Sequence, residues 1–223
     1  VLGAQAAYLG NIGDEKTPWD GLGEKDIATP EHLALSLKVA EKSMVLVKNN
    51  GVLPLKKDVR TIAVIGPNAD SRDALTGNYN GTADRYVTFL EGIQDKALGR
   101  VIFAEGCQLY KDRSSGLCQW GDRYAEAVAV AECSDVIVAC VGLDATLEGE
   151  EGDTGNEFSS GDKNDLRLPE CQRILLEKLK ATGKPMIIVN ATGSSVNVET
   201  DCDALLQAWY AGQYGGKALA NIL

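Results

Sequence analysis

The chain has 223 residues, 44% of them hydrophobic, and its 32 acidic and 22 basic residues give a net charge of −10. The hydrophobic content suffices for a packed core and excludes a disordered chain. Nucleic-acid-binding proteins and polybasic membrane-surface proteins both need a basic face, so the acidic balance argues against nucleic acid and membrane as partners. No apolar run reaches the roughly 18 residues of a membrane-spanning helix, and no basic segment marks the N-terminus as a signal peptide.

The chain begins with a polar stretch that shows no sustained periodicity. Residues 1–28 are typical of a linker or an arm lying on another domain. A helix is expected to begin at Thr29-Pro30, because threonine is a good N-cap and proline is favoured at the first helical position. Apolar residues at helical spacing predict that this helix continues to Val47. We therefore expect a single domain over 29–223.

Beyond the turn that follows this helix, short apolar runs alternate with amphipathic segments. The runs are typical of buried strands, and the amphipathic segments are typical of helices. Such alternation predicts an α/β fold, a three-layer sandwich with a mostly parallel, roughly six-stranded sheet flanked by helices on both faces. The expected strands are 61–66, 101–104, 135–142, 185–190 and 203–209. The expected helices are 88–98, 122–134, 168–181 and 215–223.

The six cysteines form no C-x-x-C pair, so the sequence contains no zinc or thioredoxin-like motif. Cys133, Cys140 and Cys171 lie in apolar-periodic stretches and are expected to be buried free thiols. A disulfide between Cys107 and Cys118 is a minor alternative for that pair. Free thiols and the acidic balance favour a cytoplasmic protein, with secretion as the alternative.

The segment between the third expected strand and the next helix, residues 143–167, is polar and rich in carboxylates. It lies at the sheet edge where α/β proteins bind ligands. A calcium loop is disfavoured, because Asp144 lacks the D-x-[DN]-x-[DN]-G spacing. A solvated acidic face without chemistry is one interpretation. A general acid is the other, because Glu148, Glu150 and Glu151 lie close in sequence and like charges favour the protonated form of one of them.

Five segments of the chain, taken in order, carry a resemblance to a known family. AEKSMVLVKNNGVLPLKKDVRTIAVIGPNAD resembles the entry to the second catalytic domain of glycoside hydrolase family 3. VGLDATLEGEEGD resembles the acid-bearing loop of that domain, and GDKNDLRLPECQ resembles its G-D-R-x-x-L-x-L-P-x-x-Q motif. The matches extend from residue 30 to residue 223 and are closest to the bacterial β-xylosidase and β-glucosidase branch. The five segments are 40–70, 77–93, 141–153, 161–172 and 207–223.

The resemblance implies the second catalytic domain of a retaining β-glycosidase, an exo-acting β-xylosidase or β-glucosidase. Its substrate would be a β-linked oligosaccharide or an aryl or alkyl glycoside. The nucleophilic aspartate would lie in an N-terminal barrel domain of the same parent chain, so this chain alone should be inactive. The domain would supply the general acid/base from the loop after the third strand. Glu150, in Gly149-Glu150, fits that position best, with Glu151 and Glu148 as alternates. We expect the C-terminal end to be truncated.

The resemblance also assigns Tyr79, Asp162 and Lys163 to the sugar site. Tyr79 would line the site, with a packed aromatic as the alternative. Asp162 would anchor the acid-bearing loop. Lys163 stands where arginine is usual, so a bidentate guanidinium contact would be lost there. Ala211 and Gln213 also depart from the family pattern, which has proline and frequently an acid at these positions.

Other classes of function agree less well with the sequence. A Ser–His or Cys–His hydrolase site would depend on His32, the single histidine, for which a structural role near a helix start is favoured. A receiver-like signalling domain needs clustered aspartates where this chain has Gly66-Pro67 and Gly142-Leu143. A non-catalytic carbohydrate-binding or scaffold domain of the same fold is the alternative function. We expect no metal ion and no cofactor.

Overall fold

The computed structural model describes residues 18–112, 116–148 and 165–223. The chain divides into two compact units, residues 1–35 and 36–223. The described part of the first unit contains a short 3-10 helix, η1 (Glu24–Asp26). The helix α2 (Pro30–Ser43) begins in this unit, and Thr29 accepts a hydrogen bond from the backbone N–H of His32 at 3.3 Å. No described helix has the length and apolar character needed to cross a membrane.

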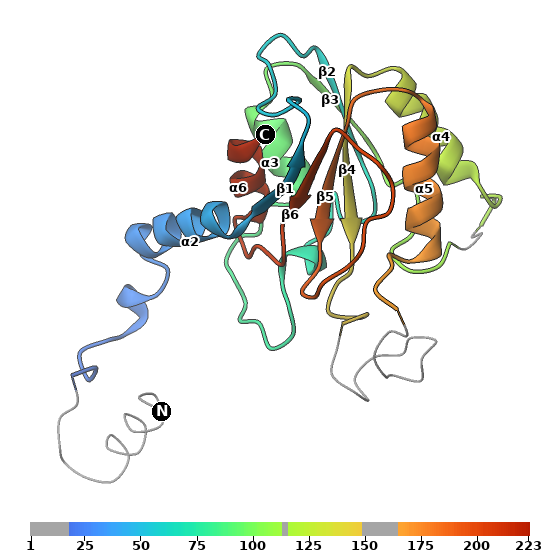
Figure 1. The fold of residues 1–223 in the computed structure, drawn as a ribbon. Helices are drawn as coiled ribbons and strands as arrows, with labels where there is room; N and C mark the ends of the chain where they lie inside the picture. The colour runs from blue at the N-terminus through green and yellow to red at the C-terminus, as the bar shows by residue number, and fades with distance from the viewer. Residues whose placement is uncertain (1–17, 113–115, 149–164) are drawn as a thin grey trace. The chain divides into compact units, whose positions relative to one another are not determined.

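The second unit is built on a six-stranded sheet with the order β1-β6-β5-β4-β2-β3. β1 pairs antiparallel with β6, and the other neighbours are parallel (Figure 1). This arrangement confirms the predicted fold class, a mostly parallel sheet of six strands. The strands are β1 (Val45–Asn49), β2 (Thr61–Ile65), β3 (Arg100–Ala104), β4 (Val136–Gly142), β5 (Met186–Ala191) and β6 (Ala204–Gln207).

Helices cover both faces of this sheet, as the alternation of apolar runs and amphipathic segments predicts (Figure 1). One core contains Val64, Val138 and residues of α3 and α6, and the other contains Ile65, Ile137 and residues of α4 and α5. Successive strand residues point to opposite faces, so the fully buried strand β4 contributes to both cores. The helices are α3 (Phe89–Lys96), α4 (Asp122–Glu132), α5 (Glu170–Ala181) and α6 (Gly215–Ile222).

α3 and α6 pack so closely that their backbones touch. A Cβ on Gly216 would lie 1.8 Å from the carbonyl oxygen of Thr88, and one on Gly92 would lie 2.0 Å from the carbonyl oxygen of Gly216. Glycine is therefore required at positions 92 and 216, where the two helices touch.

The start of α3 is fixed by a capping box. Thr88 Oγ1 accepts from the backbone N–H of Glu91, and Glu91 Oε2 accepts from the backbone N–H of Thr88.

The structure corrects the predicted end of the first helix. α2 ends at Ser43, and the residues from Val45 to Asn49, which include Val47, form strand β1. The apolar spacing does continue past Ser43, but the backbone there hydrogen-bonds with β6, where Val45 lies opposite Gln207. Tertiary pairing overrides local periodicity at this point.

The cysteines are all free thiols, and two expectations about them change. Cys140 and Cys171 are buried as predicted, but Cys133 is exposed, because α4 ends one residue before it. Cys107 is buried and Cys118 is exposed, so the alternative disulfide between them is absent.

Candidate active site

The loops that follow β2, β4, β5 and β6 converge on Glu148 at the carboxyl edge of the sheet. Glu148 lies six residues beyond the end of β4, and a tight turn sets its position. The carbonyl oxygen of Asp144 accepts from the backbone N–H groups of Leu147 and Glu148, at 3.0 Å each. Asp144 Oδ1 accepts from the backbone N–H of Thr146 at 2.9 Å and from its hydroxyl at 2.6 Å. Asp144 is buried and therefore serves as a turn-forming acceptor.

Both carboxylate oxygens of Glu148 accept hydrogen bonds from other loops. The backbone N–H of Gly193 donates to Oε2 at 2.7 Å, and that of Ser194 donates to Oε1 at 3.1 Å. The Ser194 hydroxyl also donates to Oε1, and the Tyr210 hydroxyl donates to Oε2. Asn78 Nδ2 approaches the backbone carbonyl of Glu148 at 3.4 Å. Glu148 thus holds the loop after β4 against three other loops.

One edge of the Tyr210 ring, at Cδ2 and Cε2, lies close to two glycines. A Cβ on Gly193 would approach ring atom Cε2 at 2.8 Å, and one on Gly77 would approach Cδ2 at 3.3 Å. A larger residue at position 193 would therefore displace the ring that brings the hydroxyl to Glu148. Burial raises the pKa of Tyr210, and the hydrogen bond to the negative Glu148 raises this pKa further. Tyr210 is consequently a protonated donor throughout the physiological range.

A buried amide network fixes the loops after β5 and β6 relative to each other. Asn190 Nδ2 donates to Gln207 Oε1 at 2.7 Å. Gln207 Nε2 in turn donates to Thr192 Oγ1 at 2.9 Å and to its carbonyl oxygen at 3.2 Å. Gly193, which directly follows Thr192, and Tyr210, three residues after Gln207, both donate to Glu148. The donor set is therefore held by the ends of two neighbouring strands.

The structure places two of the residues that the sequence analysis assigned to the site. Glu148 has the contacts described above. Tyr79 follows Asn78, adopts a φ of +57°, and has 81% of its surface exposed. The other assigned residues lie outside the described residues: Glu150, Glu151, Asp162 and Lys163.

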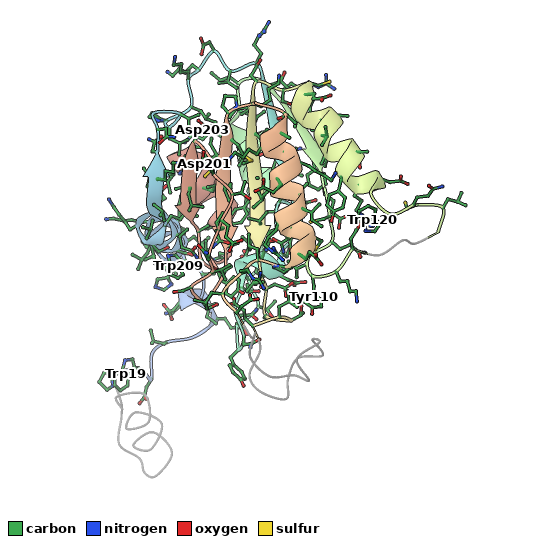
Figure 2. The ribbon with its side chains drawn as sticks, turned by 45° about the vertical axis from the view of Figure 1, so that its right-hand side comes forward. Trp19, Tyr110, Trp120, Asp201, Asp203 and Trp209 are labelled. Carbon is green, nitrogen blue, oxygen red and sulfur yellow. The ribbon has the colours of Figure 1, made fainter. Side chains whose placement is uncertain are left out.

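The partners of Glu148 were missed by the sequence analysis. Ser194 and Tyr210 each follow a predicted strand by a few residues, which places them at the ligand-binding edge and is the signal that could have identified them. Trp209 adopts a φ of +59° and donates its indole N–H to the carbonyl oxygen of Ser43 at 3.0 Å. Figure 2 shows Trp209 at this edge, whereas Asp203, which precedes β6, lies at the opposite one.

A cavity of about 520 Å³ opens beside the turn that carries Glu148, and its lining includes Leu147, Tyr110, Trp120 and Arg173. The carboxylate of Glu148 is directed to Gly193 and Tyr210 and does not line this cavity. Within the ranges that the structure describes, no group of three or more His, Cys, Asp or Glu side chains is placed to hold a metal ion.

Comparison with known proteins relates this architecture to carbohydrate-cleaving enzymes. "Beta-D-xylosidase 1" of Arabidopsis thaliana is 34% identical over 97% of this chain and 26% of its own length. "Periplasmic beta-glucosidase" of Salmonella typhimurium is 36% identical over 86% of this chain and 26% of its own length. The chain thus spans about a quarter of the length of the curated relatives it matches.

Solved structures show the same relation. A GH3 exo-beta-xylosidase, XlnD, in complex with a xylobiose aziridine activity-based probe superimposes with a TM-score of 0.81 at 30% identity, covering 99% of this chain and 27% of that one. A mutant β-glucosidase from Listeria innocua in complex with laminaribiose gives a TM-score of 0.73 at 25% identity, covering 98% of this chain and 27% of that one. Residues 44–223 match the family model described as "Glycosyl hydrolase family 3 C-terminal domain". The chain belongs to glycosyl hydrolase family 3, of which it is a C-terminal domain.

Proposed function

We propose that this domain supplies the general acid/base of a retaining β-glycosidase that acts on β-xylosides or β-glucosides. The nucleophilic aspartate lies in the remainder of the parent chain. Family membership and the names of the relatives support this proposal. The observation that carries it is the four-donor anchor on Glu148, which holds the start of the carboxylate-rich loop at the ligand-binding edge of the sheet.

In this proposal the acid/base is Glu150, and the contacts of Glu148 favour a different role for that residue. A general acid must carry a proton and present an oxygen to the leaving group. Both oxygens of Glu148 accept two hydrogen bonds each, which supports a role for Glu148 as a hydrogen-bond acceptor within the protein. Glu150 follows two residues later, in the position favoured by the family resemblance. Glu151 is the alternate.

The reaction follows the two-step course of retaining glycosidases. The aspartate attacks the anomeric carbon and forms a glycosyl–enzyme bond, while Glu150 protonates the departing glycosidic oxygen. Glu150 then removes a proton from the incoming water, whose oxygen displaces the aspartate. The two carboxyl groups should lie about 5–5.5 Å apart in the complete enzyme. The exposed ring of Tyr79 contacts the substrate, Asp162 pins the loop, and Lys163 contacts the rim.

The test uses the full-length parent enzyme and compares Glu150→Ala with the neighbouring control Glu151→Ala on nitrophenyl β-xyloside and β-glucoside, with and without azide. Glu150→Ala should retain formation of the glycosyl–enzyme from these good leaving groups. Azide should restore its turnover by forming a β-glycosyl azide, because the carboxylate that would repel azide is gone. Rescue of Glu151→Ala instead would move the role to Glu151. Sugar binding without turnover by the wild type would identify a binding domain.

A further inference from the structure

We propose that Glu148 is a positioning residue. Its carboxylate joins the acid-bearing loop to the loops after β5 and β6 and thereby sets the position and orientation of the general acid. The inference rests on the proposed function and goes beyond it by assigning a role to a second carboxylate. It also gives roles to Gly193, Ser194 and Tyr210, the residues that donate to Glu148.

The contacts of Glu148 run between loops. All four donors to its carboxylate lie 45 to 62 residues away in sequence, on the segments after β5 and β6. Those segments are themselves cross-linked through Gln207 and Thr192. The carboxylate therefore attaches the loop after β4 to a rigid pair of strand ends. Two donors on each oxygen fix the direction of the carboxylate plane as well as its distance.

The exposure of the contacts from Gly193 and Ser194 favours a positioning role for Glu148 over a role in global stability. The bonds from Gly193 and Ser194 are exposed, so water can replace the carboxylate there when Glu148 is changed. Loss of the carboxylate should accordingly cost little global stability. It should release the loop two residues before Glu150, and a displacement of about 1 Å at a reacting group can lower a rate by about 10²-fold.

The decisive measurement compares kcat/KM for substrates with poor and good leaving groups. It is made on the full-length parent enzyme that carries Glu148→Gln. Glutamine keeps the shape of the side chain but turns an NH₂ group toward two of the donors. We expect kcat/KM for an alkyl β-glycoside, which needs acid assistance, to fall by about 10²-fold. For a dinitrophenyl glycoside, which needs little assistance, kcat/KM should fall by only a few fold. Glu126→Gln, an exposed change on α4, is the matched control and should alter neither substrate.

Two companion variants test the network. Tyr210→Phe removes one donor and should give the same leaving-group pattern with a smaller loss. The double variant Glu148→Gln/Tyr210→Phe should lose less than the product of the two single losses, because both changes break one contact. Azide should not rescue Glu148→Gln, because the carboxylate of Glu150 remains in place.

Each contrary result overturns the inference in a recognisable way. Azide rescue of Glu148→Gln would make Glu148 the acid/base itself. An equal loss for both leaving groups, accompanied by a large drop in Tm, would show a merely structural role. Amide hydrogen exchange at Gly193 and Ser194 tests the contact without any substrate and should be faster in Glu148→Gln. A parent enzyme that cleaves no glycoside would refute the proposed function, while this exchange measurement would still decide whether Glu148 anchors the loop.

Discussion

Gln172 offers a sharp test of how the end of β4 is held in place. This residue lies in the first turn of α5 and is fully buried. Its Oε1 accepts from the backbone N–H of Gly142 at 2.8 Å, and its Nε2 donates to the carbonyl oxygen of the same residue at 2.8 Å. Nε2 also donates to the carbonyl oxygen of Leu109. One side chain therefore satisfies three backbone groups, two at the end of β4 and one in the loop after β3.

Replacement of Gln172 by leucine keeps the volume of the side chain but leaves those three backbone groups without partners. A buried polar group without a partner costs about 1–3 kcal/mol. The side-chain entropy that glutamine no longer loses on folding returns up to about 2 kcal/mol. The three groups together cost about 3–9 kcal/mol, so we expect Gln172→Leu to lower the free energy of unfolding by at least about 1 kcal/mol and by about 4 kcal/mol at mid-range. For a chain of this size the mid-range loss corresponds to a fall in Tm of roughly 8–16 °C.

Urea unfolding of the 223-residue chain, followed by circular dichroism, measures this loss. The matched control is Gln94→Leu, an exposed glutamine on α3, which should change the free energy of unfolding by less than about 0.5 kcal/mol. A loss below about 1 kcal/mol for Gln172→Leu, or an equal loss for both variants, would refute the argument that the three buried contacts depend on this side chain.

Three further predictions follow from the fold. Gly216→Ala should lower the free energy of unfolding by about 1–3 kcal/mol or more in the same urea assay, because its Cβ would lie 1.8 Å from the carbonyl oxygen of Thr88. Burial raises the pKa of Tyr210, so its neutral form stabilises the fold below about pH 10, the ordinary tyrosine value, and this stabilisation is lost as the pH rises further. Tyr210→Phe should therefore show a shallower alkaline loss of stability, and an unchanged slope would contradict this. A thiol reagent should label Cys118 and Cys133 rapidly in the native chain, with the four buried cysteines reacting only after unfolding.

Much of the fold could be predicted because its central strands are short apolar runs that can be identified from the local sequence alone. The runs at 61–65 and 136–142 are apolar at every or nearly every position, bounded by glycine or polar residues, and buried on both faces in the structure. The capping threonine and the proline after it made the start of α2 equally visible. These features are local, so one sequence suffices to identify them.

The features that escaped prediction depend on contacts between distant parts of the chain. Val45 to Asn49 is a strand only because β6 lies beside it, and no glycine or proline separates it from the helix before it. The same holds for Glu148. Glu148, Glu150 and Glu151 could not be distinguished by spacing, and the contacts of Glu148 with Gly193, Ser194 and Tyr210 join segments far apart in the sequence.

The placement of β1 also affects the order in which the domain can form during synthesis. Val45 pairs with Gln207, about 160 residues later in the chain. At roughly 5–20 residues per second, translation leaves β1 without its partner for about 10–30 s. In that interval its Val45-Leu46-Val47 run is an unpaired apolar edge of the kind that aggregates or recruits chaperones. The lysine and asparagine that end the strand, Lys48 and Asn49, interrupt this run and should limit its self-association before β6 emerges.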